Sequence, residues 1–278
     1  ACIRDHGSAS ITAGDPHTGR REAAEALVRC QACGDAQGVA WCYYVLGAAA
    51  FALGDYTEAS SHFLESANQF ESLDSPFGAC HAQASLGLAL RHEGKLSASL
   101  NAYRAAMRYQ RDYRFTTESA DMLDGLASIA AGLGHFDLAA RLCGAAAGWR
   151  ETYQEESWDP MPNDFDESAA NVRRRLGERA WMEAYEAGRK LNSEGAMRLA
   201  DEALSVLEEE LRRRSSGLTA REIDILRLVA DGLTNAEIAE HFVLSERTVH
   251  AHLRSIFEKL GVNTRTAAVH GASWLFAS

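Results

Sequence analysis

The sequence predicts an all-α fold, a superhelix of helical repeats followed by a small four-helix domain. Glycines recur at a step of 40 residues, at Gly54, Gly94 and Gly134, and Gly14 extends the series backwards. A fixed period of this size is typical of helical-repeat proteins. Near the C-terminus, three patterns that begin helices follow one another closely. We therefore expect repeats over residues 1–150, an acidic loop and connecting helices over 151–214, and a separate small domain over 215–278.

Small and apolar residues recur with the same step as the glycines. The aligned positions are Leu46, Leu86 and Leu126; Tyr56, Leu96 and Phe136; Ala59, Ser99 and Ala139; and Phe63, Tyr103 and Cys143. Each unit is predicted to be an antiparallel helix pair with its turn at the glycine. Small residues such as Gly47 and Gly87 would let neighbouring helices approach closely. The units resemble tetratricopeptide repeats with a longer period, and we expect their concave groove to bind an unidentified ligand or protein.

The composition changes between the array and the last domain. Residues 151–167 are rich in proline and acids, which predicts a long loop. Helices are expected to resume near Ser168, with a break at Gly177, and a further helix is expected after Ser193, which can cap it. Residues 212–217 (RRRSSG) predict a flexible hinge before the last domain.

Three helix starts of the same form lie close together in the last domain. Leu218–Ile223 (LTAREI) recurs as Leu233–Ile238 (LTNAEI) and, more loosely, as Leu244–Val249 (LSERTV). In each, a Thr or Ser can cap the helix while the preceding Leu packs against the apolar residue five positions later. The first two patterns also contain the Glu that completes a capping box. Three short helices begun in this way predict a helix-turn-helix unit, and hence DNA binding.

The third helix of this unit has two distinct faces. Val249, Leu253, Ile256 and Leu260 form one narrow apolar stripe, and Gly261 follows as a helix stop. The opposite face carries Arg247, His250, Ala251, Arg254 and Glu258. A helix that packs along one edge and carries donors along the other suits the DNA major groove. The alternative is an ordinary amphipathic surface helix.

Residues 218–270 resemble the LuxR/GerE-type DNA-binding domain through the motifs LTxRE, GLTNxEIA, SxxTVxxH and KLGVxxR. The resemblance implies a recognition helix over Glu246–Leu260. It implies contacts with base edges by His250, Ala251 and Arg254. It implies contacts with the DNA backbone by Thr234, Asn235, Ser245, Thr248, Lys259 and Arg265, and Arg247 completes the predicted site. The family usually has Lys at the position of His250, so we expect DNA binding to weaken as the pH rises through the titration range of histidine.

Net charge does not by itself indicate a nucleic-acid-binding protein. The chain has 28 Lys and Arg against 39 Asp and Glu, for a net charge of −11. Residues 218–278 contain six basic and seven acidic residues, whereas residues 245–265 contain four basic and two acidic ones. We therefore expect modest affinity in a monomer, and binding to double-stranded DNA as a homodimer.

A fourth helix is expected over residues 264–276. Its Trp274, Leu275 and Phe276 are predicted to supply an apolar surface that pairs two subunits, while Val269 fits a place in the small core equally well. The resemblance extends to large signal-transduction regulators in which an ATP-binding module precedes the repeats. It implies that the chain is the C-terminal part of such a regulator, with the nucleotide switch outside it, and RNA polymerase is a further candidate partner.

Other function classes find little support in the sequence. It contains no GxxxxGK[ST] loop, no HExxH motif and no nucleophile elbow, so we expect neither an enzyme nor a cofactor or metal site. Cys30 and Cys33 form a CxxC pair without a second pair at ligand spacing, and reduced thiols are expected in a cytoplasmic protein. No segment has the length of a membrane span, so we expect no membrane partner. A second interpretation makes the chain a helical-repeat scaffold whose appended domain binds DNA weakly, and an enzyme acting in the groove ranks far behind.

Overall fold

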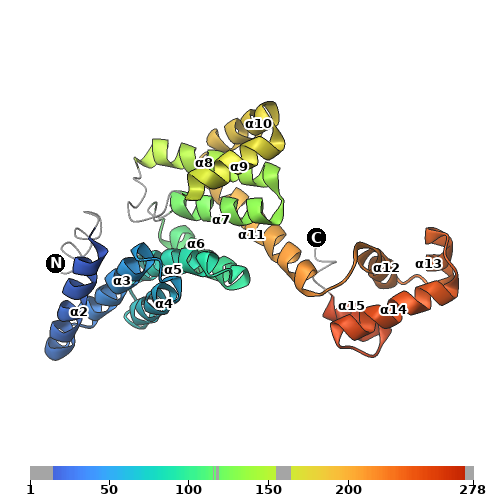
Figure 1. The fold of residues 1–278 in the computed structure, drawn as a ribbon, viewed down its shortest axis with the longest axis horizontal. Coiled ribbons are helices and arrows are strands. Elements are labelled where there is room, and N and C mark those ends of the chain that lie inside the picture. The colour runs from blue at the N-terminus through green and yellow to red at the C-terminus, as the bar shows by residue number, and fades with distance from the viewer. Residues whose placement is uncertain (1–14, 115, 117–118, 155–163, 273–278) are drawn as a thin grey trace. The chain divides into compact units, whose positions relative to one another are not determined.

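The computed structural model describes residues 15–114, 116, 119–154 and 164–272, and this part of the chain is α-helical without β-strands (Figure 1). The expected all-α fold is thus confirmed. The chain divides into two compact units, residues 1–205 and 206–278, and the division falls inside helix α11 (Ser193–Ser215). None of the described helices combines the length and the apolar character that crossing a bilayer requires.

The first unit begins with helices that follow one another at a regular step (blue to green in Figure 1). They are α2 (Pro16–Cys33), α3 (Ala36–Ala52), α4 (Tyr56–Ser72), α5 (Pro76–His92), α6 (Leu96–Tyr113), α7 (Ser119–Leu133) and α8 (Phe136–Tyr153). From α2 to α6 each helix packs against the next, and α7 packs against α8. This arrangement is that of a helical array, while the tetratricopeptide-like type of its repeat stays a prediction.

Left-handed backbone conformations recur every 20 residues, at half the period of the glycines. Residues with φ between 50° and 91° lie at Gly34, Gly54, Asp74, Gly94, Arg114, Gly134 and Gln154. The 40-residue glycine series marks only every second position, because most of the others are residues that carry a Cβ and adopt this φ less readily. One helix of about 20 residues is therefore the structural step, and the 40-residue repeat is a pair of helices. Gly14 lies outside the described residues.

Most links between consecutive helices of the array are short and are closed by a recurring set of hydrogen bonds. After the left-handed Gly54, the N–H of Asp55 donates to the carbonyl of Ala50 (2.9 Å), and the Asp55 carboxylate accepts from the N–H of Glu58 (2.9 Å). The same backbone bond to the fifth preceding residue is donated by Asp35, Ser75, Lys95 and His135. Backbone carbonyls at the end of one helix and N–H groups at the start of the next, which would otherwise lack a partner, are thus hydrogen-bonded. These bonds close a tight turn.

Close packing in the array depends on small residues, as the sequence predicts. A Cβ added at Gly47 would lie 2.8 Å from the ring of Phe63, and one added at Gly87 would lie 2.7 Å from the ring of Tyr103. Phe63 and Tyr103 are both buried. In these two repeats the aromatic residue thus fills the space that the glycine of the preceding helix leaves.

Two acids of α7 share one arginine of α8. The Arg150 guanidinium lies 2.7 Å from the carboxylates of both Asp121 and Asp124. Burial raises the pKa of Asp124 to about 6, although Arg150 acts to lower it. The two helices are therefore joined by charges inside the array, one of which titrates near neutral pH.

Two further helices, α9 (Asp164–Leu176) and α10 (Glu178–Arg189), follow in the first unit. Their break lies at Gly177 (φ 80°), as predicted, whereas α9 begins before the expected Ser168. Helix α10 crosses α8 very closely, since a Cβ at Gly144 would lie 1.9 Å from a backbone carbonyl oxygen of α10. The crossing therefore requires glycine on α8.

The predicted hinge over residues 212–217 is wrong in its extent. Helix α11 continues through Ser215, so the three arginines are helical. Glu210 accepts hydrogen bonds from Arg213 (2.7 Å) and Arg214 (2.7 Å), and those from Arg213 contribute most to lowering its pKa to about 2. Such pairs three and four residues apart, with cations in the last turn, favour the extra helical turn.

The second unit contains α12 (Ala220–Ala230), α13 (Asn235–Phe242), α14 (Glu246–Leu260) and α15 (Arg265–Gly271). Helix α14 contacts the other three, and they enclose one apolar core. Val269 packs against this core, as one of its two interpretations predicts. Helix α15 is described as far as Gly271, and residues 273–276 of the expected helix lie outside the described residues. Trp274, Leu275 and Phe276 are among them.

The described cysteines are not joined to one another by disulfide bonds. They are the cysteines at 30, 33, 42, 80 and 143, and no cluster of His, Cys, Asp or Glu within the described ranges could hold a metal ion. Burial raises the pKa of Cys42 and of Cys143 to about 12, so both thiols stay protonated.

Candidate nucleic-acid interface

Capping boxes begin both helices that precede α14. Thr219 Oγ1 accepts from the N–H of Glu222 (3.3 Å), and the N–H of Thr219 donates to the Glu222 carboxylate (2.7 Å). Thr234 and Glu237 repeat both bonds at the same distances. Both boxes are those that the sequence predicts, and they fix the residues at which α12 and α13 begin.

Helix α14 begins at a simpler cap and buries one face. Ser245 Oγ accepts from the N–H of Thr248 (3.1 Å), which starts the helix. Val249, Leu253 and Ile256 are at most 5% exposed and belong to the core of the unit. The helix has the predicted bounds, and its apolar stripe is buried as predicted.

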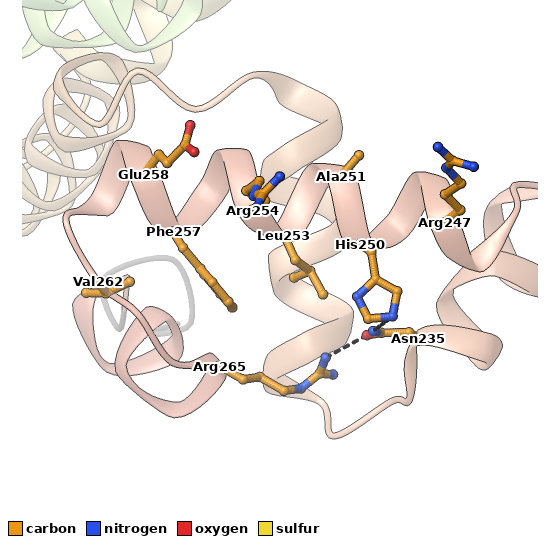
Figure 2. A pocket seen from close by; sticks show the side chains of 10 residues that line it. All are labelled: Asn235, Arg247, His250, Ala251, Leu253, Arg254, Phe257, Glu258, Val262 and Arg265. Atoms are coloured by element: carbon orange, nitrogen blue, oxygen red, sulfur yellow. Dashed lines mark hydrogen bonds between the residues drawn. The ribbon is translucent and has the colours of Figure 1, made fainter.

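The opposite face of α14 is open. Arg247, His250, Ala251 and Arg254 are exposed and line a hollow of about 740 Å³. Asn235 and Arg265, from α13 and α15, line the same hollow, and in Figure 2 Arg265 points toward Asn235, which lies beside His250 of α14. Six of the ten residues predicted for the site are thus gathered around one hollow.

A chain of hydrogen bonds crosses one side of this hollow. Arg265 Nη1 donates to Asn235 Oδ1 (3.0 Å), and Arg265 Nη2 donates to the carbonyl of Leu233. Asn235 Nδ2 in turn lies 3.2 Å from His250 Nε2 (Figure 2). The start of α15 is therefore tied to the start of α13, and this places Asn235 against the side chain of His250.

The motifs do not predict the role of Glu222, which joins α12 to α14. Its carboxylate accepts from Lys259 Nζ (2.6 Å) and Ser255 Oγ (2.6 Å) in addition to the Thr219 N–H. Burial alone would raise the pKa of Glu222, but these hydrogen bonds, with that of Lys259 first among them, lower it to about 2. The sequence does hold one signal for this contact, because Ser255 and Lys259 are four residues apart and share a face of α14.

The remaining predicted site residues are engaged inside the unit. Thr234, Ser245 and Thr248 take part in the N-terminal caps of α13 and α14. Lys259 does not line the hollow, and its ammonium is bound to Glu222. Its positive charge is therefore largely balanced within the domain.

The turn between α13 and α14 contains a strained residue. Val243 has left-handed φ 54° and ψ 48°, and 92% of it is exposed. β-branched residues rarely adopt this conformation. The turn demands it, because the N–H of Leu244 then donates to the carbonyl of Ala239 (2.8 Å) and ends α13. The two helices are thus joined by a tight turn, at a cost in backbone strain.

Comparison with known proteins places the second unit in a family. The family model described as "Bacterial regulatory proteins, luxR family" matches residues 216–272. A protein named as an HTH-type transcriptional regulator of Mycobacterium tuberculosis is 30% identical over 153 residues, which are 55% of this chain and 17% of that protein. The HTH-type transcriptional activator RamA of Corynebacterium glutamicum is 45% identical over 60 residues, or 22% of this chain and 21% of RamA. The transcriptional regulatory protein DegU of Brevibacillus brevis is 44% identical over 62 residues, or 22% of this chain and 26% of DegU.

This chain spans only a small part of its mycobacterial relative, 17% of the length. The family match covers α12 to α15, and it therefore includes both capping boxes and the exposed face of α14. At residues 216–272, the chain carries a helix-turn-helix DNA-binding domain of the luxR family of bacterial regulatory proteins.

Proposed function

We propose that the chain is part of a bacterial transcription regulator and that α14 binds in the major groove of double-stranded DNA. The observation that carries the proposal is the exposed, donor-rich face of α14 opposite its buried stripe. The names of these three relatives, each of which describes a transcriptional regulator, support it. Because the chain spans a small part of the mycobacterial relative, we also propose, rather than infer from that relative, that this chain takes part in regulating transcription.

Base edges are proposed to be read by the side chains that line the hollow. The guanidinium of Arg254 can donate two parallel hydrogen bonds to guanine, and the methyl group of Ala251 can contact that of thymine. His250 lies on the same face and can form one hydrogen bond with a base. Arg247 lies one turn closer to the helix N-terminus and extends the donor-rich face in that direction.

The DNA backbone is proposed to lie across the N-termini of α13 and α14. Free N–H groups and the helix dipole attract phosphate at such ends. Thr234, Asn235, Ser245 and Thr248 are the residues at these two ends, and their side chains keep the N-termini in place. Lys259 and Arg265 lie near the proposed path of the backbone but already donate to protein acceptors. We propose that Arg265 adds positive charge there rather than a free donor, and that Lys259, whose charge Glu222 largely balances, adds less.

Binding is proposed to require two copies of the chain on paired half-sites. The last domain carries a charge of −1, so one copy has little general attraction for DNA and a second copy compensates for this. A ligand or protein bound by the repeat array would control this pairing, and contact with RNA polymerase would follow from binding at a promoter.

Selection of binding sites from random duplexes tests the proposal with the intact chain. We expect one enriched motif with two-fold symmetry and an affinity that falls steeply with salt. Arg254→Ala should cost about 1–3 kcal/mol and blur one base position in each half-site. Arg227→Ala removes an exposed arginine of α12 and is the matched control, which should leave base preference unchanged. If no motif is enriched even at low salt while the array captures a protein, the chain acts as a scaffold instead.

A further inference from the structure

Three side chains in the hollow form a directed chain of hydrogen bonds that ends on the recognition helix. Arg265, at the start of α15, donates to both the Asn235 side chain and the Leu233 carbonyl. Asn235, the first residue of α13, lies between Arg265 and His250 (Figure 2). His250 is exposed, whereas Asn235 and Arg265 are half-buried. These hydrogen bonds thus lead from two half-buried side chains to the exposed, donor-rich face of α14.

The chemistry of arginine fixes the direction of every bond in this chain. A guanidinium can only donate, so the atom of Asn235 that faces Arg265 must be the carbonyl oxygen Oδ1. The amide nitrogen Nδ2 then faces His250, and an amide nitrogen can only donate. His250 Nε2 must therefore accept, which requires that it carry no proton. In a neutral imidazole the proton then resides on Nδ1.

We propose that Asn235 and Arg265 are positioning residues that select, for the neutral ring of His250, the form protonated on Nδ1. This fixes the hydrogen bond that the ring offers to DNA: Nε2 is engaged by Asn235, and Nδ1–H remains as a donor. His250 thus supplies a hydrogen-bond donor without needing a positive charge. The expectation from the sequence, that DNA binding weakens as the pH rises, assumes a charged ring instead.

A fixed donor selects among bases. In the major groove, guanine presents the acceptors N7 and O6, adenine presents N7 and thymine presents O4, whereas the amino groups of cytosine and adenine donate. A ring that offers Nδ1–H to the groove therefore favours a base acceptor and disfavours an amino group. Asn235 and Arg265 would influence this preference without contacting a base. This second half of the inference rests on the proposed DNA binding by α14.

The tautomer can be measured in the intact chain without DNA. Correlation of ring protons with ring nitrogens in 15N-histidine-labelled protein distinguishes a protonated from an unprotonated nitrogen, and loss of one signal set in His250→Gln assigns it among the ten histidines. The measurement is made at about pH 8.5, where ordinary histidines are neutral. An unconstrained imidazole in water favours the Nε2–H form, so an Nδ1–H pattern for His250 would mark a constraint.

Asn235→Asp reverses the direction of one bond with almost no change in shape. A carboxylate can only accept, so it keeps the bond from Arg265 but now requires a proton on His250 Nε2. An acid in the first turn also favours the helix, so the fold of α13 should persist. We expect His250 to change from the Nδ1–H to the Nε2–H pattern in this variant. Asn263→Asp, which adds the same charge at an exposed position, is the control and should leave the pattern unchanged.

Arg265→Met provides a second variant, because it removes the group that orients the Asn235 amide. We expect a mixture of the two His250 tautomers, while far-ultraviolet circular dichroism reports whether the helices remain. An Nε2–H pattern in the original chain, or the same pattern before and after Asn235→Asp, would overturn the inference about positioning.

Site selection with the same variants tests the consequence for DNA. Asn235→Asp should move the preference at one base position from a base acceptor to an amino group, by roughly five- to tenfold, relative to Asn263→Asp. If the tautomer changes and the preference does not, His250 is positioned as inferred but reads no base. If no variant selects any motif, the proposed DNA binding fails while the positioning by Asn235 and Arg265 stands.

Discussion

Replacement of Glu222 by glutamine should destabilise the C-terminal unit in a pH-dependent way. The pKa of this carboxyl is about 2 in the folded chain against an ordinary value of 4.5, a difference that corresponds to about 3 kcal/mol at neutral pH. Because the folded pKa is the lower one, the stabilisation is complete above pH 4.5 and is lost as the pH falls through 2. Glutamine keeps the shape but not the charge that Lys259 and Ser255 bind. We expect a loss of about 2–3 kcal/mol at about pH 7, and roughly half of that at about pH 3.

Hydrogen exchange can measure this loss for α14 alone. The intact chain is equilibrated along a urea gradient at each pH and then labelled at one common pH. Peptides from residues 246–260 report the fraction of molecules in which α14 is unfolded. The urea midpoint, multiplied by the slope of the transition, gives the free energy of unfolding.

A matched control separates the buried carboxylate from charge in general. Glu240→Gln removes the same charge from an exposed position on α13 and should shift the midpoint by no more than about 0.5 kcal/mol. If Glu222→Gln behaves like Glu240→Gln, or if its effect is equally large at both pH values, the ionic link between α12 and α14 does not stabilise the unit as reasoned.

Three other changes have clear expected outcomes. Val243→Asn should stabilise the C-terminal unit by about 0.5–1 kcal/mol in the same urea assay, because asparagine tolerates a left-handed φ of 54° better than a β-branched residue does. An unchanged or lower urea midpoint would contradict strain at this turn. Gly144→Ala should lower the thermal stability of the array by about 2–3 kcal/mol, because the added Cβ would clash with the backbone of α10. Gly132→Ala is the control: no atom lies within 4 Å of its new Cβ, and it should raise the stability by about 0.5–1 kcal/mol. Equal effects of the two substitutions would rule out the close crossing of α8 and α10. Because the pKa of Asp124 is raised to about 6, the array should become more stable as the pH falls from about 7.5 to about 5. Asp124→Asn should remove this part of the pH dependence of the melting temperature of the array. Identical pH profiles for the original chain and the variant would argue against the raised pKa.

The sequence predicts most of the features that depend on neighbouring residues. The capping boxes at Thr219 and Thr234, and the two faces of α14, follow from spacings of three and four residues, and each is present as expected. The 20-residue step is hidden because Asp74 and Arg114 adopt the conformation that glycine marks elsewhere. Local composition also misplaced the hinge, since the arginines after Glu210 and Ser215 continue a helix that ion pairs stabilise.

The local sequence patterns do not predict contacts between residues that lie far apart along the chain. Lys259 pairs with a residue 37 positions away, and Arg265 with one 30 positions away, so neither partner is visible in a local pattern. The resemblance identified both as basic residues near DNA, whereas the structure commits both to acceptors inside the domain. Only the fold brings His250 and Asn235 together, 15 positions apart.

The regular step of the array also makes its length adjustable. If Gly54 were joined directly to Lys95, the chain would lose one helix pair of 40 residues, and a left-handed residue would still be followed by the start of a helix. Tyr103 would then meet Gly47 in place of Gly87, a glycine that already accommodates an aromatic ring. Units of this kind can be removed or duplicated by recombination while the joints between helices keep their form, so the size of the surface offered to a partner can change without a new fold.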